Sequence, residues 1–351
     1  MSGSVPGIDF ERLTPWFRAN VVSVDELRAE IIGHGRSNLT YRVQAEEKSW
    51  VLRRPPLSHV QPTAHDMKRE FRVISALAAT DVPVPGTVAL CEDTTVNDAP
   101  FYIMEYVEGF VPADSAEFAR RFDEAQRRRT ADQLIDILVH LHSVTPAEVG
   151  LGDFGKPEGY LERQVRRFSE QLARVKTRDV PDLEELGRRL ASALPTQSGS
   201  GIVHGDYRLD NCILDEAGRI VAVLDWEMAT LGDPLADVGL LMMYWADPGA
   251  GGGLAAPGIA STAVTALPGF LTRQEVLARY SEGSGRDLSS LDFYTVLAHF
   301  KLAVILENMH ARFLAGGTVG AGFEVIGQNA LLLGSRGLEV ANRSPVVALR
   351  G

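Results

Sequence analysis

The stretch "IVHGDYRLDNCIL", residues 202–214, places a His, an Asp and an Asn in one short segment between two apolar runs. One glycine separates His204 from Asp206, and Asn211 follows five positions after Asp206. Asp and Asn in a loop often serve only as turn formers or helix caps. The flanking sequence therefore has to show whether this loop carries chemistry, because a catalytic site needs several polar groups in one place.

A hairpin is predicted directly downstream of the loop. Apolar runs at 212–214 and 220–224 flank the turn-forming "DEAG" at 215–218. In an antiparallel hairpin, the residue that enters the first strand lies about 5 Å from the residue that leaves the second. These two residues are Asn211 and Asp225. An amide oxygen and a carboxylate at one hairpin mouth suit Mg²⁺, which prefers hard oxygen ligands and shares them with substrate phosphates.

Asp206 lies in the loop just before this predicted metal site. A carboxylate in that position can orient a substrate hydroxyl group and accept its proton during phosphoryl transfer. His204 is predicted to pack beneath the loop and to hydrogen-bond its backbone, which is a structural role. We therefore expect Asp206 to be the catalytic base, and Asn211 and Asp225 to be the Mg²⁺ ligands.

The spacing His-x-Asp-x4-Asn, followed by an Asp after a hairpin, resembles the catalytic and metal-binding segments of the protein-kinase-like fold. With Gly205 in the middle, "HGDYRLDN" resembles the aminoglycoside phosphotransferases and related small-molecule kinases. "VLRRPP" (51–56), "TDVPVP" (80–85) and residues 149–168 resemble a bacterial subgroup related to kinase domains fused to acyl-CoA dehydrogenases. The resemblance covers about residues 25–340 and implies ATP as the phosphate donor.

The pattern along the chain fits an α+β, bilobal protein-kinase-like fold. Alternating apolar residues around 39–43 predict an antiparallel sheet, and 64–78 carries one helical apolar stripe. Long amphipathic helices follow after Gly109. We expect an N-terminal extension (1–24), a nucleotide-binding lobe with the small sheet (25–105) and a helical lobe with the catalytic loop and substrate pocket (106–351).

"GHGRSN", residues 33–38, lies between two predicted strands rather than between a strand and a helix. This context excludes a dinucleotide-binding fingerprint, and no G-x-x-x-x-G-K-[ST] motif occurs. Taken alone, such a turn is more often a plain hairpin. In the kinase arrangement, a strand–glycine–strand flap covers the phosphates, and glycines let backbone N–H groups approach them. The expected nucleotide-binding residues of this flap are Gly33, Gly35, Ser37 and Asn38, with Asn38 in the place of a third glycine.

The resemblance also implies a cation on the third strand and a Glu on the following helix, which together grip the α- and β-phosphates. Glu70 is the only central acid of the predicted helix, and Arg53 stands where the family usually has Lys. Arg binds phosphate bidentately but with stricter geometry than Lys, so Arg54 remains a rival for this role. In the last strand of the lobe, adenine is expected to contact Met104 and the backbone of Glu105 and Val107.

The segment "GDPLADVG", residues 232–239, follows Asp225 too closely to leave room for the peptide-binding activation segment of a protein kinase. A small-molecule hydroxyl group is therefore the expected acceptor. Asp233 is interpreted as a helix cap, and the resemblance implies that Asp237 holds the catalytic loop through backbone N–H groups. An aminoglycoside and a hydroxyacyl-CoA ester both remain open as the acceptor. The Arg53 departure also leaves open a nucleotide-binding regulator without transfer activity.

The formal net charge of −11 argues against nucleic acid or an anionic membrane as a partner. The two cysteines are far apart and lack metal-ligand spacing, which fits a reducing cytoplasm. The longest apolar stretch, 239–246, is much shorter than the roughly 20 residues of a membrane span. The first residues carry no basic segment followed by an apolar run, so no secretory signal is expected. The composition does not indicate an oligomeric state.

Overall fold

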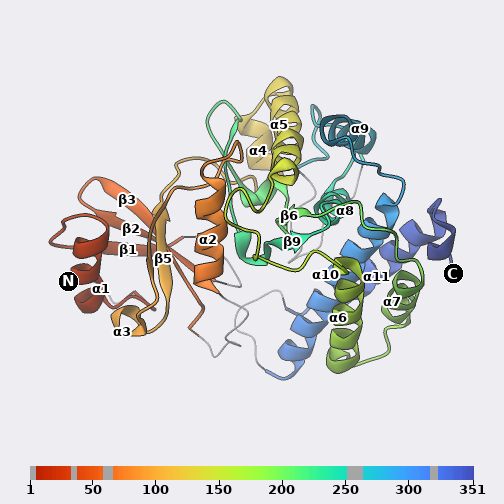
Figure 1. Cartoon of the computed structure of the whole chain (residues 1–351), viewed down its shortest axis with the longest axis horizontal. Helices are drawn as coiled ribbons and strands as arrows, with labels where there is room; N and C mark the ends of the chain where they lie inside the picture. Colours follow the sequence, from red (N-terminus) through yellow and green to blue (C-terminus); the bar gives the residue numbers. More distant parts are fainter. Residues whose placement is uncertain (1–4, 33–37, 58–65, 251–263, 317–322) are drawn as a thin grey trace. The chain divides into compact units, whose positions relative to one another are not determined.

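The computed structural model describes residues 5–32, 38–57, 66–250, 264–316 and 323–351. The chain divides into two compact units (Figure 1). The first unit contains Met1–Gly109 and Val221–Ala229, and the second contains Phe110–Ile220 and Thr230–Gly351. The expected α+β fold is confirmed, because an antiparallel sheet in the first unit is followed by a mainly helical second unit.

The first unit is built on a five-stranded antiparallel sheet with the strand order β1-β2-β3-β5-β4. Alternate residues of β2 are buried, as the sequence pattern predicts. The helix predicted at 64–78 begins only at Met67, because the Asp66 side chain caps it by accepting the Arg69 N–H. The elements of this unit are α1 (Phe10–Asn20), β1 (Arg28–Ile31), β2 (Leu39–Ala45), β3 (Lys48–Arg54), α2 (Met67–Leu77), β4 (Thr87–Cys91), α3 (Thr94–Asn97) and β5 (Phe101–Glu105).

The division of the chain differs in two respects from the lobes expected from the sequence. Leu13 and Phe17 of α1 are fully buried in the same apolar core as Tyr41 and Val43, so this helix is part of the first unit. The segment Val221–Ala229 also clusters with the first unit. One hydrogen bond that holds the segment there runs from the N–H of Val223 to the carbonyl oxygen of Pro83, over 2.8 Å.

The second unit is mainly helical, and short strands flank some of its loops. Its elements are α4 (Ser115–Arg121), α5 (Glu124–Ser143), α6 (Tyr160–Val175), α7 (Pro181–Ser192), β6 (Gly201–Val203), β7 (Cys212–Leu214), β9 (Thr230–Gly232), α8 (Leu235–Tyr244), α9 (Arg273–Ser284), α10 (Leu291–Leu314) and α11 (Ile326–Arg343). α10 packs against α6, α8 and α11. Among the described residues, no helix combines the length and apolarity that a membrane crossing requires.

The predicted hairpin is present. β7 and β8 (Ile220–Val223) form a two-stranded sheet, and the Asp215 N–H donates to the carbonyl oxygen of Arg219 across the turn. Gly218 lies in the left-handed region at φ +78°, a conformation that residues with a Cβ atom rarely adopt. β6 pairs with β9 rather than with this hairpin. The catalytic loop predicted from the sequence therefore joins two separate small sheets.

Candidate active site

The loop after β6 brings Asp206 and Asn211 together. A 3₁₀ turn at Leu209–Asn211 folds the chain back, and the Asn211 side-chain amide donates to the Asp206 carbonyl oxygen over 2.8 Å. The same amide nitrogen donates to Oδ2 of the Asp206 carboxylate over 3.0 Å. The Asp206 side chain is 27% exposed. A partly exposed carboxylate that is held by a neighbouring side chain can still contact a substrate, as a general base must.

The backbone of this loop is fixed by the buried carboxylate of Asp237 on α8. Its Oδ2 accepts the N–H of His204 over 2.7 Å, and its Oδ1 accepts the N–H of Gly205 over 2.8 Å. His142 on α5 approaches the same carboxylate, with Nε2 at 3.2 Å from Oδ2. The contacts expected of Asp237 are thus confirmed. His204 also bonds the loop backbone as predicted, since its Nδ1 accepts the Asp206 N–H over 3.2 Å.

Replacing Asp237 by Ala should strongly destabilise the second unit. The change leaves two backbone N–H groups and His142 without their acceptor, and each unpaired buried group costs about 1–3 kcal/mol. We expect the free energy of unfolding to fall by about 3 kcal/mol or more. Urea denaturation at pH 7 measures this loss, with Asp179→Ala as the matched control because Asp179 is exposed. An equal loss in both variants would mean that the Asp237 carboxylate does not stabilise the loop through these hydrogen bonds.

The pH dependence of this contribution follows from the pKa of Asp237. Burial alone would raise that pKa, but the hydrogen bonds from His142 and from the N–H of Gly205 lower it, so the pKa of Asp237 lies below its ordinary value. A carboxylate with a lowered pKa stabilises the folded state above its unfolded pKa of about 3.9. This contribution is complete at pH 7 and is lost as the pH falls through the folded value.

Arg208 was missed by the sequence reasoning. Its Nε lies 3.3 Å from Oδ2 of Asp206, and its Nη1 lies 3.2 Å from Oδ2 of Asp210. The guanidinium also stacks over the ring of Tyr244, 5.1 Å from the ring centroid. The only sequence signal is that Arg208 stands two positions after Asp206. Asp206 therefore has a cation beside it that the motif alone does not predict.

In the first unit, the predicted pair of Arg53 and Glu70 is present. Nε of Arg53 lies 3.2 Å from Oε1 of Glu70, and the side chains are 12% and 2% exposed. Arg53 also donates through Nη2 to Oδ1 of Asp225, and the same nitrogen lies 3.4 Å from Oε2 of Glu227. Burial raises the pKa of Glu70 to about 7, and the Arg53 charge opposes that rise. One guanidinium thus serves three carboxylates.

Glu227 is the second residue that the sequence reasoning missed. Its Oε2 accepts the side-chain amide of Asn38 over 2.9 Å, so an expected nucleotide-binding residue is tied to the segment that follows the hairpin. Asp225 itself lies in the left-handed region at φ +66°, which is uncommon for a residue with a Cβ. Such strain is often found at functional sites.

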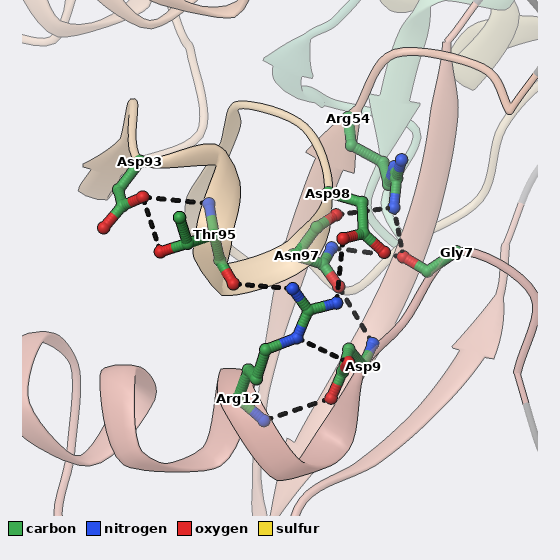
Figure 2. A network of polar contacts seen from close by, with 8 residues as sticks. All are labelled: Gly7, Asp9, Arg12, Arg54, Asp93, Thr95, Asn97 and Asp98. Carbon is green, nitrogen blue, oxygen red and sulfur yellow. Dashed lines mark hydrogen bonds and ion pairs between the residues drawn. The ribbon is translucent and has the colours of Figure 1, made fainter.

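Arg54 has a different task from Arg53. It donates to the carbonyl oxygens of Gly7 and Asn97, and Figure 2 shows both contacts beside the bonds of Arg12 with Asp9 and Asp98. Arg54 therefore ties the segment before α1 to α3. This removes it as a rival for the predicted phosphate-binding role.

The remaining nucleotide-binding predictions fall partly outside the described residues. Gly33, Gly35 and Ser37 lie outside them. Met104 is buried on β5, and its expected contact with adenine stays a prediction. The N–H of Glu105 donates to the carbonyl oxygen of Gly86 over 2.8 Å, so this N–H already has a partner within the first unit, and the expected contact of the Glu105 backbone with adenine stays a prediction. Val107 follows β5 by two positions.

The residues expected to hold Mg²⁺ have the right donor chemistry. The Asn211 amide nitrogen donates to Asp206, so its oxygen is the atom that would bind a cation, and Asp225 has a 31% exposed carboxylate whose Oδ1 accepts from Arg53. Oxygen donors of this kind fit Mg²⁺. Asp225 belongs to the first unit, while Asp206 and Asn211 belong to the second. Their convergence stays a prediction. The described residues contain no group of three or more His, Cys, Asp and Glu side chains that could hold a metal ion.

Comparison with known proteins gives concordant matches. A model of the phosphotransferase enzyme family matches residues 28–283. Mouse acyl-CoA dehydrogenase family member 10 is 36% identical over 285 residues, which cover 81% of this chain and 26% of that protein. Human acyl-CoA dehydrogenase family member 11 is 29% identical, covering 88% of this chain and 39% of the relative. The chain thus spans well under half the length of these curated relatives.

Solved structures support the same conclusion about the fold. The structure of a putative aminoglycoside phosphotransferase from Ralstonia eutropha is 33% identical, with a TM-score of 0.80, covering 95% of this chain and 98% of that one. A choline kinase from Cryptosporidium parvum is 14% identical with a TM-score of 0.65, covering 97% and 98% of the two chains, and shows the fold alone. The protein-kinase-like fold that the sequence resemblance implied is confirmed.

Proposed function

The chain belongs to the phosphotransferase enzyme family, and from this premise we propose that it is an ATP- and Mg²⁺-dependent small-molecule kinase. The γ-phosphate would pass from ATP to a hydroxyl group of the acceptor. The observation that carries this proposal is the paired arrangement of Asp206 and Asn211, in which one amide contacts both the backbone and the carboxylate of the proposed base. A turn with only a structural role has no need to fix a partly exposed carboxylate in this way.

In the proposed reaction, the acceptor oxygen attacks the γ-phosphorus and the bond to the β–γ bridging oxygen breaks, so ADP leaves. Asp206 orients the attacking hydroxyl group and accepts its proton at the carboxylate. Arg53, held by Glu70, is assigned to the α- and β-phosphates. Asn211 and Asp225 would hold Mg²⁺, which neutralises phosphate charge when bound.

Two acceptor classes follow from the relatives. The curated relatives are named as acyl-CoA dehydrogenase family members, which favours a hydroxyacyl-CoA ester. The related solved structure is described as a putative aminoglycoside phosphotransferase, which favours an aminoglycoside. Fold and family do not choose between them, because one fold hosts many acceptors.

An ATP-consumption screen tests the proposal. The full chain is incubated with MgATP and, in parallel, with hydroxyacyl-CoA esters, aminoglycosides, choline-like amines and sugars, and ADP release is followed. Phosphorylated acceptor, identified by a mass increase of one phosphoryl group, is the expected result with one class. Tight ATP binding without turnover on any acceptor, and without slow ATP hydrolysis that depends on Asp206, would instead favour the nucleotide-binding regulator.

A further inference from the structure

The peptide bond that leads into Asp206 is held at both of its polar atoms. On one side the Asp206 N–H donates to Nδ1 of His204 over 3.2 Å. On the other side the carbonyl oxygen of Gly205 accepts a hydrogen bond from Nζ of Lys301 over 3.1 Å. The orientation of this peptide plane sets where the Cα–Cβ bond of Asp206 points. Two side chains from different parts of the chain therefore determine the direction of the proposed base.

Lys301 reaches the loop from α10, 96 positions away in the sequence. Among the described residues, no carboxylate lies within ion-pair distance of its ammonium group, and the acceptor it has is a neutral carbonyl. Burial lowers the pKa of Lys301, while the charges of Asp206 and Asp237 oppose that fall. Lys301 is partly buried, and partial withdrawal of an ammonium group from water without an ion-pair partner is unfavourable. A task for Lys301 in the loop, through its hydrogen bond to the Gly205 carbonyl, would explain why this unfavourable position is kept.

A direct role in binding an acceptor does not fit the space around Lys301. Lys301, Gly205 and Asp237 line a cavity of about 20 Å³ together with Tyr160 and Gln164. A cavity of that size holds about one water molecule. A substrate does not fit there, so the ammonium group acts on the loop and not on a ligand inside this cavity.

We propose that Lys301 is a positioning residue for the proposed base: by holding the Gly205 carbonyl it fixes the peptide plane from which the Asp206 side chain projects. The inference rests on the proposed function, because it assigns Lys301 a task in the reaction. This task of Lys301 differs from that of Asp237. The Asp237 carboxylate accepts the N–H groups of His204 and Gly205 and does not hold the Gly205 carbonyl.

Replacing Lys301 by Met removes the donor and keeps an unbranched side chain of similar length. The expected result is a kcat that is about 10- to 100-fold lower, because small misplacements of a catalytic group are costly. The KM for ATP should stay within about twofold of the wild-type value, because Lys301 is not assigned any contact with ATP. In an Asp206→Ala background, the same replacement should have no further effect on residual turnover, because a positioning residue acts only through the base. Lys176→Met is the matched control, since Lys176 forms only an exposed pair with Glu184.

A second measurement does not depend on turnover. Amide hydrogen exchange of the segment 202–209 should be faster in Lys301→Met than in the wild type and in Lys176→Met, with α11 unchanged. Slower turnover with unchanged exchange in this segment would overturn the proposal, as would equal losses with and without Asp206. If the wild type transfers no phosphate to any acceptor, the proposed function fails, and the exchange of 202–209 alone decides whether Lys301 positions the loop.

Discussion

Asp206→Ala is expected to lower kcat for phosphoryl transfer by about 10²- to 10⁴-fold while ATP affinity stays unchanged. The reason is that the carboxylate is assigned to orient the acceptor hydroxyl group and to take its proton, steps that matter only in the transition state. The fold should survive, because the Asp206 side chain is partly exposed and its backbone contacts do not need the carboxylate. The measurement is steady-state ADP release with the acceptor found in the screen, together with the melting temperature.

The control for this prediction is Glu216→Gln, which removes an exposed carboxylate from the nearby hairpin turn. Its kcat should equal that of the wild type. Asp206→Asn extends the test, because the amide keeps the shape of the side chain but cannot take up the proton. An Asp206→Ala variant with more than about a tenth of the wild-type kcat would remove the proposed base.

The fold and the inner geometry of the catalytic loop could be predicted because they rest on local signals. Asp206 and Asn211 are five positions apart, and a short turn is enough to join them. The hairpin follows from a turn between two apolar runs. The apolar stripe of α2 follows from helical periodicity, whereas the burial of Glu70 on the same helix does not, because periodicity of apolar residues says nothing about a buried acid.

Apart from Arg208, which stands two positions after Asp206, the residues that sequence reasoning missed make contacts between distant segments. Lys301 contacts Gly205 across 96 positions, and Glu227 contacts Asn38 across 189. No periodicity or motif encodes such distances, since periodicity reports only which face of an element is buried. Arg53 and Arg54 illustrate the same limit, because neighbours in a strand face opposite sides. Alternation separates the two arginines but does not say which side carries the carboxylates.

Asp225→Asn is expected to weaken MgATP binding by at least about 10- to 100-fold. Changing a residue that merely supports a metal ligand already weakens metal binding by about this factor. In the proposed site, the carboxylate is a direct ligand of Mg²⁺, and an amide binds this hard cation less well. Arg53 keeps its contacts with Glu70 and Glu227 in this variant, so the first unit should remain folded. Calorimetric titration with MgATP, and with ATP in the presence of EDTA, measures both affinities.

Only the titration with Mg²⁺ should show weaker binding in Asp225→Asn, and this difference is the sharper part of the test. Asp225, Glu70 and Glu227 together surround the single Arg53 guanidinium, which leaves an excess of negative charge beside the proposed phosphate-binding group. Without Mg²⁺, that charge repels ATP and Asp225 competes with phosphate for Arg53. Removing the Asp225 charge should therefore preserve or raise the affinity for metal-free ATP. Glu227→Gln, which also removes a negative charge beside Arg53 but no proposed ligand, should not weaken MgATP binding. Equal weakening of both titrations by Asp225→Asn would mean that Asp225 supports the fold of the site and holds no metal.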